Sequence, residues 1–245
     1  MNSKINSVSR IHEILLNIAG ASPQTSVLDV WAQTFEVNET DGIKKAALVS
    51  EKLVLLLNEL QLAENEIAKS FSEAAYSRLI ANLNNAFSPM LLSANWNSVH
   101  QYLSVDIMSS LAIFREALPN EEQSINIEEL NELHARISEL ENFLENSSLP
   151  DRVIQLIKRH IRLIREALSN YKIAGAKTLI EARRAAYGEF FEVKEVLQEN
   201  YNPDEIAKLK TIWSQLNKLT DGALKIYGLY EIGKEALPAL EQFLK

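Results

Sequence analysis

Apolar residues recur at three- and four-residue intervals along most of the chain, which is the spacing of one buried helical face. The alternation of apolar and polar residues that is typical of half-buried strands is hard to find. The most regular apolar stripe lies within residues 150–168, at Val153, Leu156, Ile157, Ile161, Ile164 and Leu168. The pattern predicts an all-α protein, an irregular bundle of about eight or more helices.

The apolar spacing, together with turn residues and helix-start signals, also predicts where the helices lie. We expect helices over about 4–19, 27–35, 43–70, 97–118, 126–146, 150–168, 176–200 and 206–244, with 71–87 either continuing the third or forming its own. Asn126 is the expected cap of its helix, and Glu129 completes a capping-box pattern. The connecting segments are expected to be a long loop at 82–98, a solvated connector at 119–122 and a turn at 169–175.

The C-terminal segment, residues 206–244, has apolar residues at a spacing close to that of a coiled-coil seam. Glycines and a proline interrupt this spacing, at Gly222, Gly228, Gly233 and Pro238. We therefore expect broken helices that pack closely on a neighbour. The aromatic residues of a possible interaction segment here are Trp213, Tyr227 and Tyr230.

Charge is distributed unevenly in this chain of net charge −8. Residues 1–150 hold nine Lys/Arg and twenty Asp/Glu, whereas residues 151–194 hold ten Lys/Arg and five Asp/Glu. This contrast suggests an acidic N-terminal helical region, residues 1–147, and a C-terminal helical region with a basic helix, residues 148–245. One continuous domain is the alternative.

The basic residues of the helix at 150–168 lie opposite its apolar stripe, at Arg152, Lys158, Arg159, Arg162 and Arg165. One interpretation is that acidic helices of the same chain, or water, neutralise them. The other is a surface for a phosphate group or an acidic partner. A protein partner or self-association is favoured over nucleic acid, because the acidic chain repels polyanions and has no nucleic-acid-binding motif.

The absence of cysteine from the sequence excludes disulfides, thiolate metal sites and a cysteine nucleophile. No apolar run approaches the roughly 20 residues of a membrane span, and the polar N-terminus does not resemble a signal peptide. We expect a cytoplasmic protein without a cofactor. Membrane-surface association through the last helix is disfavoured by its acidic residues Glu231, Glu235 and Glu241.

The four histidines do not form a recognisable catalytic or metal-binding motif. Seven residues separate Arg152 from His160, more than in the Arg–His motif of helical HEPN-type nucleases. His160 and His134 are both expected at core or boundary positions, and they would approach each other if their two helices form a hairpin. The alternative is a pH-sensitive or catalytic histidine pair. The acidic cluster Glu128, Glu129 and Glu132 is interpreted as compensation of a helix dipole, not as a metal site.

Residues 10–16, 28–35 and 171–177 and the tail from Trp213 onward together resemble a group of uncharacterised bacterial all-helical proteins. The similarity spans most of the chain. None of these segments is a functional motif, so the resemblance implies a bacterial cytoplasmic protein and carries no activity.

Two hypotheses for the function follow. The first is a non-catalytic interaction or scaffold protein, in a bacterial setting an immunity, antitoxin or phage-defence component, acting through the basic face and residues 206–244. The alternative is a helical effector or enzyme that acts on a phosphate-containing substrate through the Arg- and His-bearing helix at 150–168. The lack of a catalytic motif favours the first.

Overall fold

The computed structural model describes residues 4–122, 125–145, 147, 151–185, 208, 211, 212, 214, 215 and 218. These residues form helices and no strand, apart from an isolated antiparallel bridge between Ser26 and Asn95. The all-α class predicted from the sequence is therefore confirmed. The chain divides into two compact units, which we call unit 1 (residues 1–121 with 172–174) and unit 2 (residues 122–171 with 175–245).

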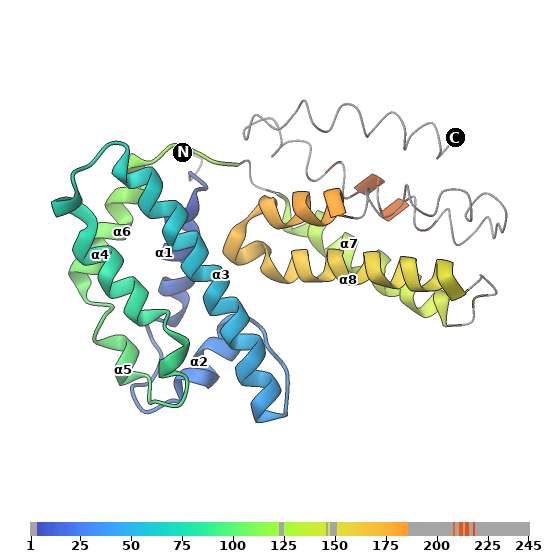
Figure 1. Cartoon of the computed structure of the whole chain (residues 1–245), viewed down its shortest axis with the longest axis horizontal. Helices are drawn as coiled ribbons and strands as arrows, with labels where there is room; N and C mark the ends of the chain where they lie inside the picture. Colours follow the sequence, from blue (N-terminus) through green and yellow to red (C-terminus); the bar gives the residue numbers. More distant parts are fainter. Residues whose placement is uncertain are drawn as a thin grey trace. The chain divides into compact units, whose positions relative to one another are not determined.

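Unit 1 is built around its first helix (Figure 1). Its elements are α1 (Ser7–Ile18), α2 (Val27–Thr34), α3 (Gly42–Ala68), α4 (Glu73–Ala86), the 3-10 helix η1 (Pro89–Leu91), α5 (Asn97–His100) and α6 (Val105–Ala117). Helix α1 packs against α2, α3 and α6, and even its polar residues Ser9, Arg10 and His12 are buried. A helix buried on nearly every side needs internal partners for its polar groups.

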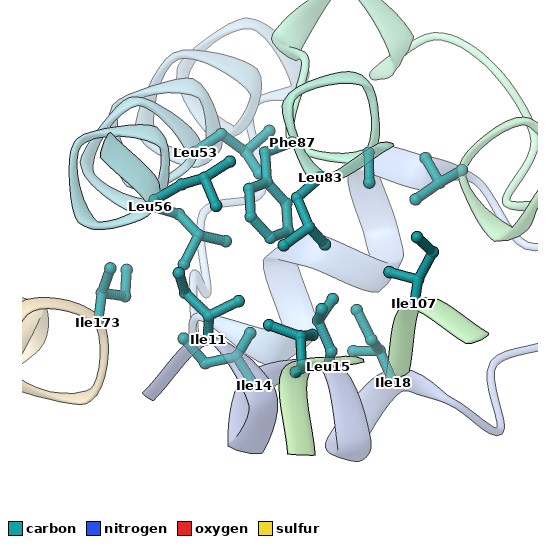
Figure 2. Packing of buried hydrophobic residues seen from close by; sticks show 14 of the residues in the cluster. Ile11, Ile14, Leu15, Ile18, Leu53, Leu56, Leu83, Phe87, Ile107 and Ile173 are labelled. Carbon is teal, nitrogen blue, oxygen red and sulfur yellow. The ribbon is translucent and has the colours of Figure 1, made fainter. Parts of the chain in front are cut away.

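Apolar side chains from several helices converge on the core of unit 1 (Figure 2). The residues labelled there are Ile11, Ile14, Leu15 and Ile18 of α1, Leu53 and Leu56 of α3, Leu83 and Phe87, Ile107 of α6, and Ile173. Most of them belong to the three- and four-residue stripes predicted from the sequence. Burial of these stripes is the main source of stability that the fold offers.

Two tryptophans anchor one end of this core. Trp31 stacks on Phe35 at 5.3 Å between ring centroids and meets Trp96 edge-on at 5.7 Å. Neither tryptophan is exposed, and neither indole N–H has a hydrogen-bond acceptor. Edge-to-face contact with neighbouring rings partly compensates such a donor. Trp31 and Trp96 are thus fully buried residues of the core of unit 1.

The long loop predicted at 82–98 is wrong for most of its length. Helix α4 continues to Ala86, because Asn82 donates a hydrogen bond back to the carbonyl of Arg78 at 2.8 Å and so suits a helix. The remainder contains η1 and the start of α5. Backbone bonds such as Trp96 N–H to Thr25 at 2.7 Å pin this segment to the loop before α2.

The single helix predicted at 97–118 is also wrong, since α5 ends at His100 and α6 begins at Val105. Leu103 and Ile107 are four residues apart, so apolar spacing alone hides the break. Ser104, with an extended backbone, starts the new helix. The boundary between α3 and α4, which the sequence left open, lies at Ser72, and α4 is a separate helix.

Unit 2 contains α7 (Ile127–Leu144), most of α8 (Asp151–Ala174) and a helical stretch at residues 176–185. The last three residues of α8 belong to unit 1. Apolar residues of α7 and α8 form one core. Asn126 caps α7 as predicted, accepting from the backbone N–H of Glu128 at 2.9 Å, whereas the Glu129 carboxylate accepts from Lys218. Contacts thus place α7 in the second unit, although composition grouped it with the acidic N-terminal region.

The turn predicted at 169–175 is wrong, because α8 continues to Ala174. Ile173 and Ala174 are buried, so the helix extends the apolar stripe beyond Leu168. Gly175, in the left-handed region with φ of 66°, ends it. The helix predicted at 176–200 is observed as far as residue 185, and the rest of it, like most of the segment predicted at 206–244, lies outside the described residues.

Candidate functional site: the basic face of α8

Helix α8 is divided lengthwise between a buried side and a charged side. Val153, Ile157, Ile161 and Ile164 are buried in the core of unit 2. The charged side exposes Arg152, Lys158, Arg159 and Arg162, which we call the basic face. The sequence prediction of an amphipathic basic helix is therefore confirmed for these residues.

Arg165, the fifth predicted cation, behaves differently. Its guanidinium donates to Glu141 of α7, with Nε 3.0 Å from Oε1, and to the hydroxyl of Ser138 at 3.1 Å. The side chain of Arg165 is 37% exposed. The interpretation that an acidic helix of the same chain neutralises the basic residues therefore holds for Arg165.

Three residues of the basic face lack such compensation. In the part of the chain that the structure describes, Arg152, Lys158 and Arg162 have no ion-pair partner. Many cations elsewhere do have carboxylate partners: Arg10, Lys45, Lys69, Arg78, Arg115, Arg136, Lys172, Lys208 and Lys218. Arg152, Lys158 and Arg162 thus expose positive charge to solvent without a carboxylate partner among the described residues.

His160 does not join this face. It is completely buried among the apolar residues of α8, and burial, with a smaller contribution from the charge of Arg159, lowers its pKa to about 4. The imidazole is therefore neutral at physiological pH. Because His160 is buried in the core and Arg152 is exposed to solvent, these two residues do not form an Arg–His site.

The two histidines of the predicted hairpin lie in different environments. His160 is in the core, as expected, but His134 is exposed on α7, so its expected core or boundary position is wrong. Its neighbours Leu133 and Ile137 take the buried positions on that helix. Successive residues point to different sides of a helix, so His134, which directly follows the buried Leu133, faces solvent.

Unit 1 contains a buried charge network that sequence reasoning missed. The Arg10 guanidinium, on α1, donates to Glu59 of α3 at 2.7 Å and to Glu121 at 2.9 Å. Only 8% of the Arg10 side chain and 2% of the Glu59 side chain are exposed. Glu59 lies between the buried residues Leu56 and Leu60. Its place on the apolar stripe was the available signal, since an acid at such a position requires a cation.

Glu121 links this network to the beginning of α1. Its Oε1 accepts from the backbone N–H of Ser7 at 3.0 Å and from the Ser7 hydroxyl at 3.1 Å. A carboxylate at a helix N-terminus satisfies free N–H groups and complements the helix dipole. The connector predicted at 119–122 is present and exposes Pro119 and Asn120, but the prediction that its two acids are solvated is wrong, because both bind to helices.

His12 lies near the same network, on α1. Arg115 of α6 donates to its Nδ1 at 3.2 Å and to Glu13 at 3.0 Å. Burial lowers the pKa of His12, the charge of Arg115 lowers it further, and Glu13 opposes these effects. Since a guanidinium can only donate, Nδ1 acts as the acceptor and His12 is neutral in this arrangement.

Glu122 plays a corresponding part in unit 2. It is 1% exposed, and its Oε2 accepts from the backbone N–H of Ala176 at 2.6 Å, at the start of the helical stretch 176–185. A Cβ added at Gly175 would lie 2.3 Å from Oε1 of Glu122. Glycine is therefore required here both for its positive φ and for the close approach of the carboxylate.

A cavity of about 400 Å³ lies beside α7, lined by Glu129, Glu132, Arg136, Thr211, Ser214, Gln215 and Lys218. Its charges are already paired, Glu132 with Arg136 at 2.6 Å and Glu129 with Lys218 at 3.0 Å. No cluster of acids and histidines with metal-site geometry occurs among the described residues. The lining thus offers no net charge to a ligand.

The aromatic residues of the predicted interaction segment, Trp213, Tyr227 and Tyr230, lie outside the described residues. Over the residues described, the search for a helix with the length and apolar character to cross a membrane found none. Comparison of the chain with protein-family models, curated proteins and solved structures gave no match. The resemblance to bacterial helical proteins stays a prediction.

Proposed function

We propose that this protein is a non-catalytic interaction protein that binds an acidic protein partner through the basic face of α8. The observation that carries the proposal is the set of exposed cations Arg152, Lys158, Arg159 and Arg162, three of which have no ion-pair partner in the described part of the chain. An exposed single-sign surface attracts and orients an oppositely charged partner.

Three arginines among these four residues support recognition of carboxylates, because a guanidinium donates two parallel hydrogen bonds to one carboxylate. The burial of His160 on the other side of the helix removes a general base from this surface, so the enzyme hypothesis gains no support.

The test is affinity capture from a lysate of the source organism at low salt, with nuclease treatment as a parallel arm. The variant changes all four residues of the basic face to Glu. A matched control changes Lys44, Lys45, Lys69 and Arg78 of unit 1 to Glu, which alters the net charge equally. We expect a stoichiometric protein partner that the control retains, the variant loses and nuclease leaves in place.

Retention of the same partner by the variant would contradict the proposal. Loss of the captured material on nuclease treatment would mean that the basic face binds nucleic acid instead. The identity of a retained partner also tests the expectation of an immunity, antitoxin or phage-defence role.

A further inference from the structure

Helix α3 of unit 1 (Figure 1) is apolar on its solvent side as well as on its core side. Its buried apolar residues are Val49, Leu53, Leu56, Leu60, Ala63 and Ile67. Four of the eight large apolar residues that are exposed in the described part of the chain also lie on α3: Ile43 at 85%, Leu48 at 41%, Val54 at 49% and Leu62 at 39%. A helix with apolar residues on both sides is normally covered on both sides, and a group of exposed apolar residues marks an interaction surface.

The exposed apolar residues of α3 share one side of the helix, which we call the outer face. At about 100° per residue they span roughly 140°, opposite the buried residues. The outer face also contains Lys44, Ala47, Glu51, Leu55, Asn58, Gln61 and Asn65, of which all but the half-buried Leu55 are exposed. Over the 27 residues of α3 the outer face is about 40 Å long. Its mixture of apolar and polar residues suits a partner that binds reversibly.

The charges inside α3 are ordered against the helix dipole. Lys44 and Lys45 lie near the N-terminus of the helix, and Glu64 and Glu66 lie near its C-terminus. An isolated helix is stabilised by the opposite order, with acids first and bases last. A second helix that runs antiparallel along α3 and carries the same charge order places acids beside these lysines and lysines beside these acids. The charge order of α3 is therefore complementary to itself.

Most of this complementary charge is open to a partner. Lys44 has no ion-pair partner among the described residues, whereas Lys45 is bound by Asp29 at 2.5 Å. Glu66 accepts from Lys69 through Oε1 at 2.6 Å, and its Oε2 stays open. An exposed pair within one helix contributes only a few tenths of a kcal/mol, so Glu66 can also bind a second cation.

We infer that the outer face of α3 binds the same face of a second copy of this chain, with the two α3 helices antiparallel about a two-fold axis near Val54. Leu48 of each copy then packs near Leu62 of the other, and Lys44 approaches the acids at 64 and 66. A parallel pair would instead oppose Lys44 to Lys44 and Glu66 to Glu66, which is unfavourable. Such a dimer is isologous and leaves no outer face uncovered. Dimerisation through α3 is independent of the acidic partner proposed for α8.

The first test is sedimentation velocity of the full-length chain from about 1 µM to 300 µM, where we expect a concentration-dependent shift from monomer to dimer. The variant replaces three outer-face residues by serine: Leu48→Ser, Val54→Ser and Leu62→Ser. The matched control does the same at three residues in other elements of unit 1 that are at least 65% exposed: Met90→Ser, Val105→Ser and Ile113→Ser. We expect the variant to weaken dimerisation at least about tenfold and the control to leave it unchanged. Thermal unfolding establishes that both chains are folded.

The second test reads the orientation with single cysteines, because the chain has none of its own. Ala47, Val54 and Gln61 are exposed and lie seven residues apart on the outer face. A disulfide requires Cα atoms within about 7 Å of each other. We expect Val54→Cys to cross-link with itself. Ala47→Cys and Gln61→Cys should cross-link only when the two variants are mixed, because each lies roughly 20 Å along the axis from its own copy in the antiparallel pair.

A chain that stays monomeric at every concentration would overturn the inference, as would equal weakening in the serine variant and its control. Self cross-linking of Ala47→Cys and of Gln61→Cys would show a parallel pair and would overturn the antiparallel arrangement. A monomer whose three introduced thiols react slowly with maleimide would mean that another segment of the same chain covers the outer face, which also excludes the dimer.

Discussion

The two units use positive charge in opposite ways. In unit 1, Arg10 is buried and bound by Glu59 and Glu121 within 2.9 Å. In unit 2, Arg152 and Arg162 are exposed and have no ion-pair partner among the described residues. A cation held by its own unit contributes to folding and is not available to a partner. An exposed cation contributes little to folding and remains available for recognition.

The largest effect is expected where the buried charge of unit 1 is broken. Arg10→Met leaves Glu59 buried without this cation, and we expect a loss of about 3–5 kcal/mol in the free energy of unfolding. Urea denaturation, with hydrogen exchange to locate the loss, measures it. The surface pair of Lys45 with Asp29 is the matched control, and Lys45→Met should cost less than about 1 kcal/mol. Equal losses in the two variants would show that burial of the Arg10 pair is energetically unimportant.

The next effect concerns unit 2 and pH. Because the pKa of His160 is lowered to about 4 from 6.5, protons bind the unfolded chain first as the pH falls. The contribution of His160 to the free energy of unfolding should be constant above pH 6.5. It should be lost progressively as the pH falls towards 4, by at most roughly 3 kcal/mol.

The measurement is the exchange of α8 amides between pH 7 and pH 4, compared for the native chain and His160→Met. The variant should lose this part of the pH dependence. His12 shifts in the same direction in unit 1, so the α1 amides provide the reference. A native-like pH profile of α8 in the variant would contradict the assignment to His160.

A smaller effect is expected at the close approach of Glu122 and Gly175. Gly175→Ala introduces a Cβ at positive φ and 2.3 Å from the carboxylate, and should destabilise unit 2 by about 2 kcal/mol. Gly42→Ala is the control, because no atom lies within 4 Å of its added Cβ, and it should be neutral or slightly stabilising. In a Glu122→Ala background the cost of Gly175→Ala should shrink, since only the backbone strain remains. An undiminished cost would exclude the carboxylate as its cause.

The smallest effect on stability is expected on the basic face. Arg152→Gln or Arg162→Gln should change the free energy of unfolding by no more than about 0.5 kcal/mol, because each is an exposed position without an ion pair. Arg165→Gln removes the pair with Glu141 and should cost more, up to about 1 kcal/mol. Thermal unfolding of the three variants gives the order, and a larger loss for Arg162 would place it among the structural cations.

Local periodicity predicted the helices well and predicted their connections poorly. The ranges expected for α1 and α3 differ from the observed ones by a few residues, since each is one long apolar stripe with a terminal signal such as Gly20. The break before Ser104 was missed because apolar spacing continues across it. The extension of α8 beyond Leu168 was missed because polar residues at 169–172 resemble a turn.

The candidate site, like the fold, was predicted only in its local features. An amphipathic pattern places Arg152 and Arg162 on a solvent face, but it does not say which cations find an acid on another helix. Arg165 does so because Glu141 faces it across the α7–α8 contact. The network of Arg10 joins residues up to 111 positions apart, and such partners depend on tertiary packing. Glu121 and Glu122 were predicted to be solvated because their partners are also distant in the sequence.

The positions of Glu121 and Glu122 also affect the order of events during synthesis. When Glu121 is added, Ser7, Arg10 and Glu59 have already been made, so the chain then contains the residues that bind to each other through Glu121 and Arg10. Glu122 follows at once, but its partner Ala176 comes 54 residues later. At translation speeds of about 5–20 residues per second, this acid waits roughly 3–11 s for its helix. The chain therefore contains the partners of Glu121 well before it contains the backbone N–H group that Glu122 binds.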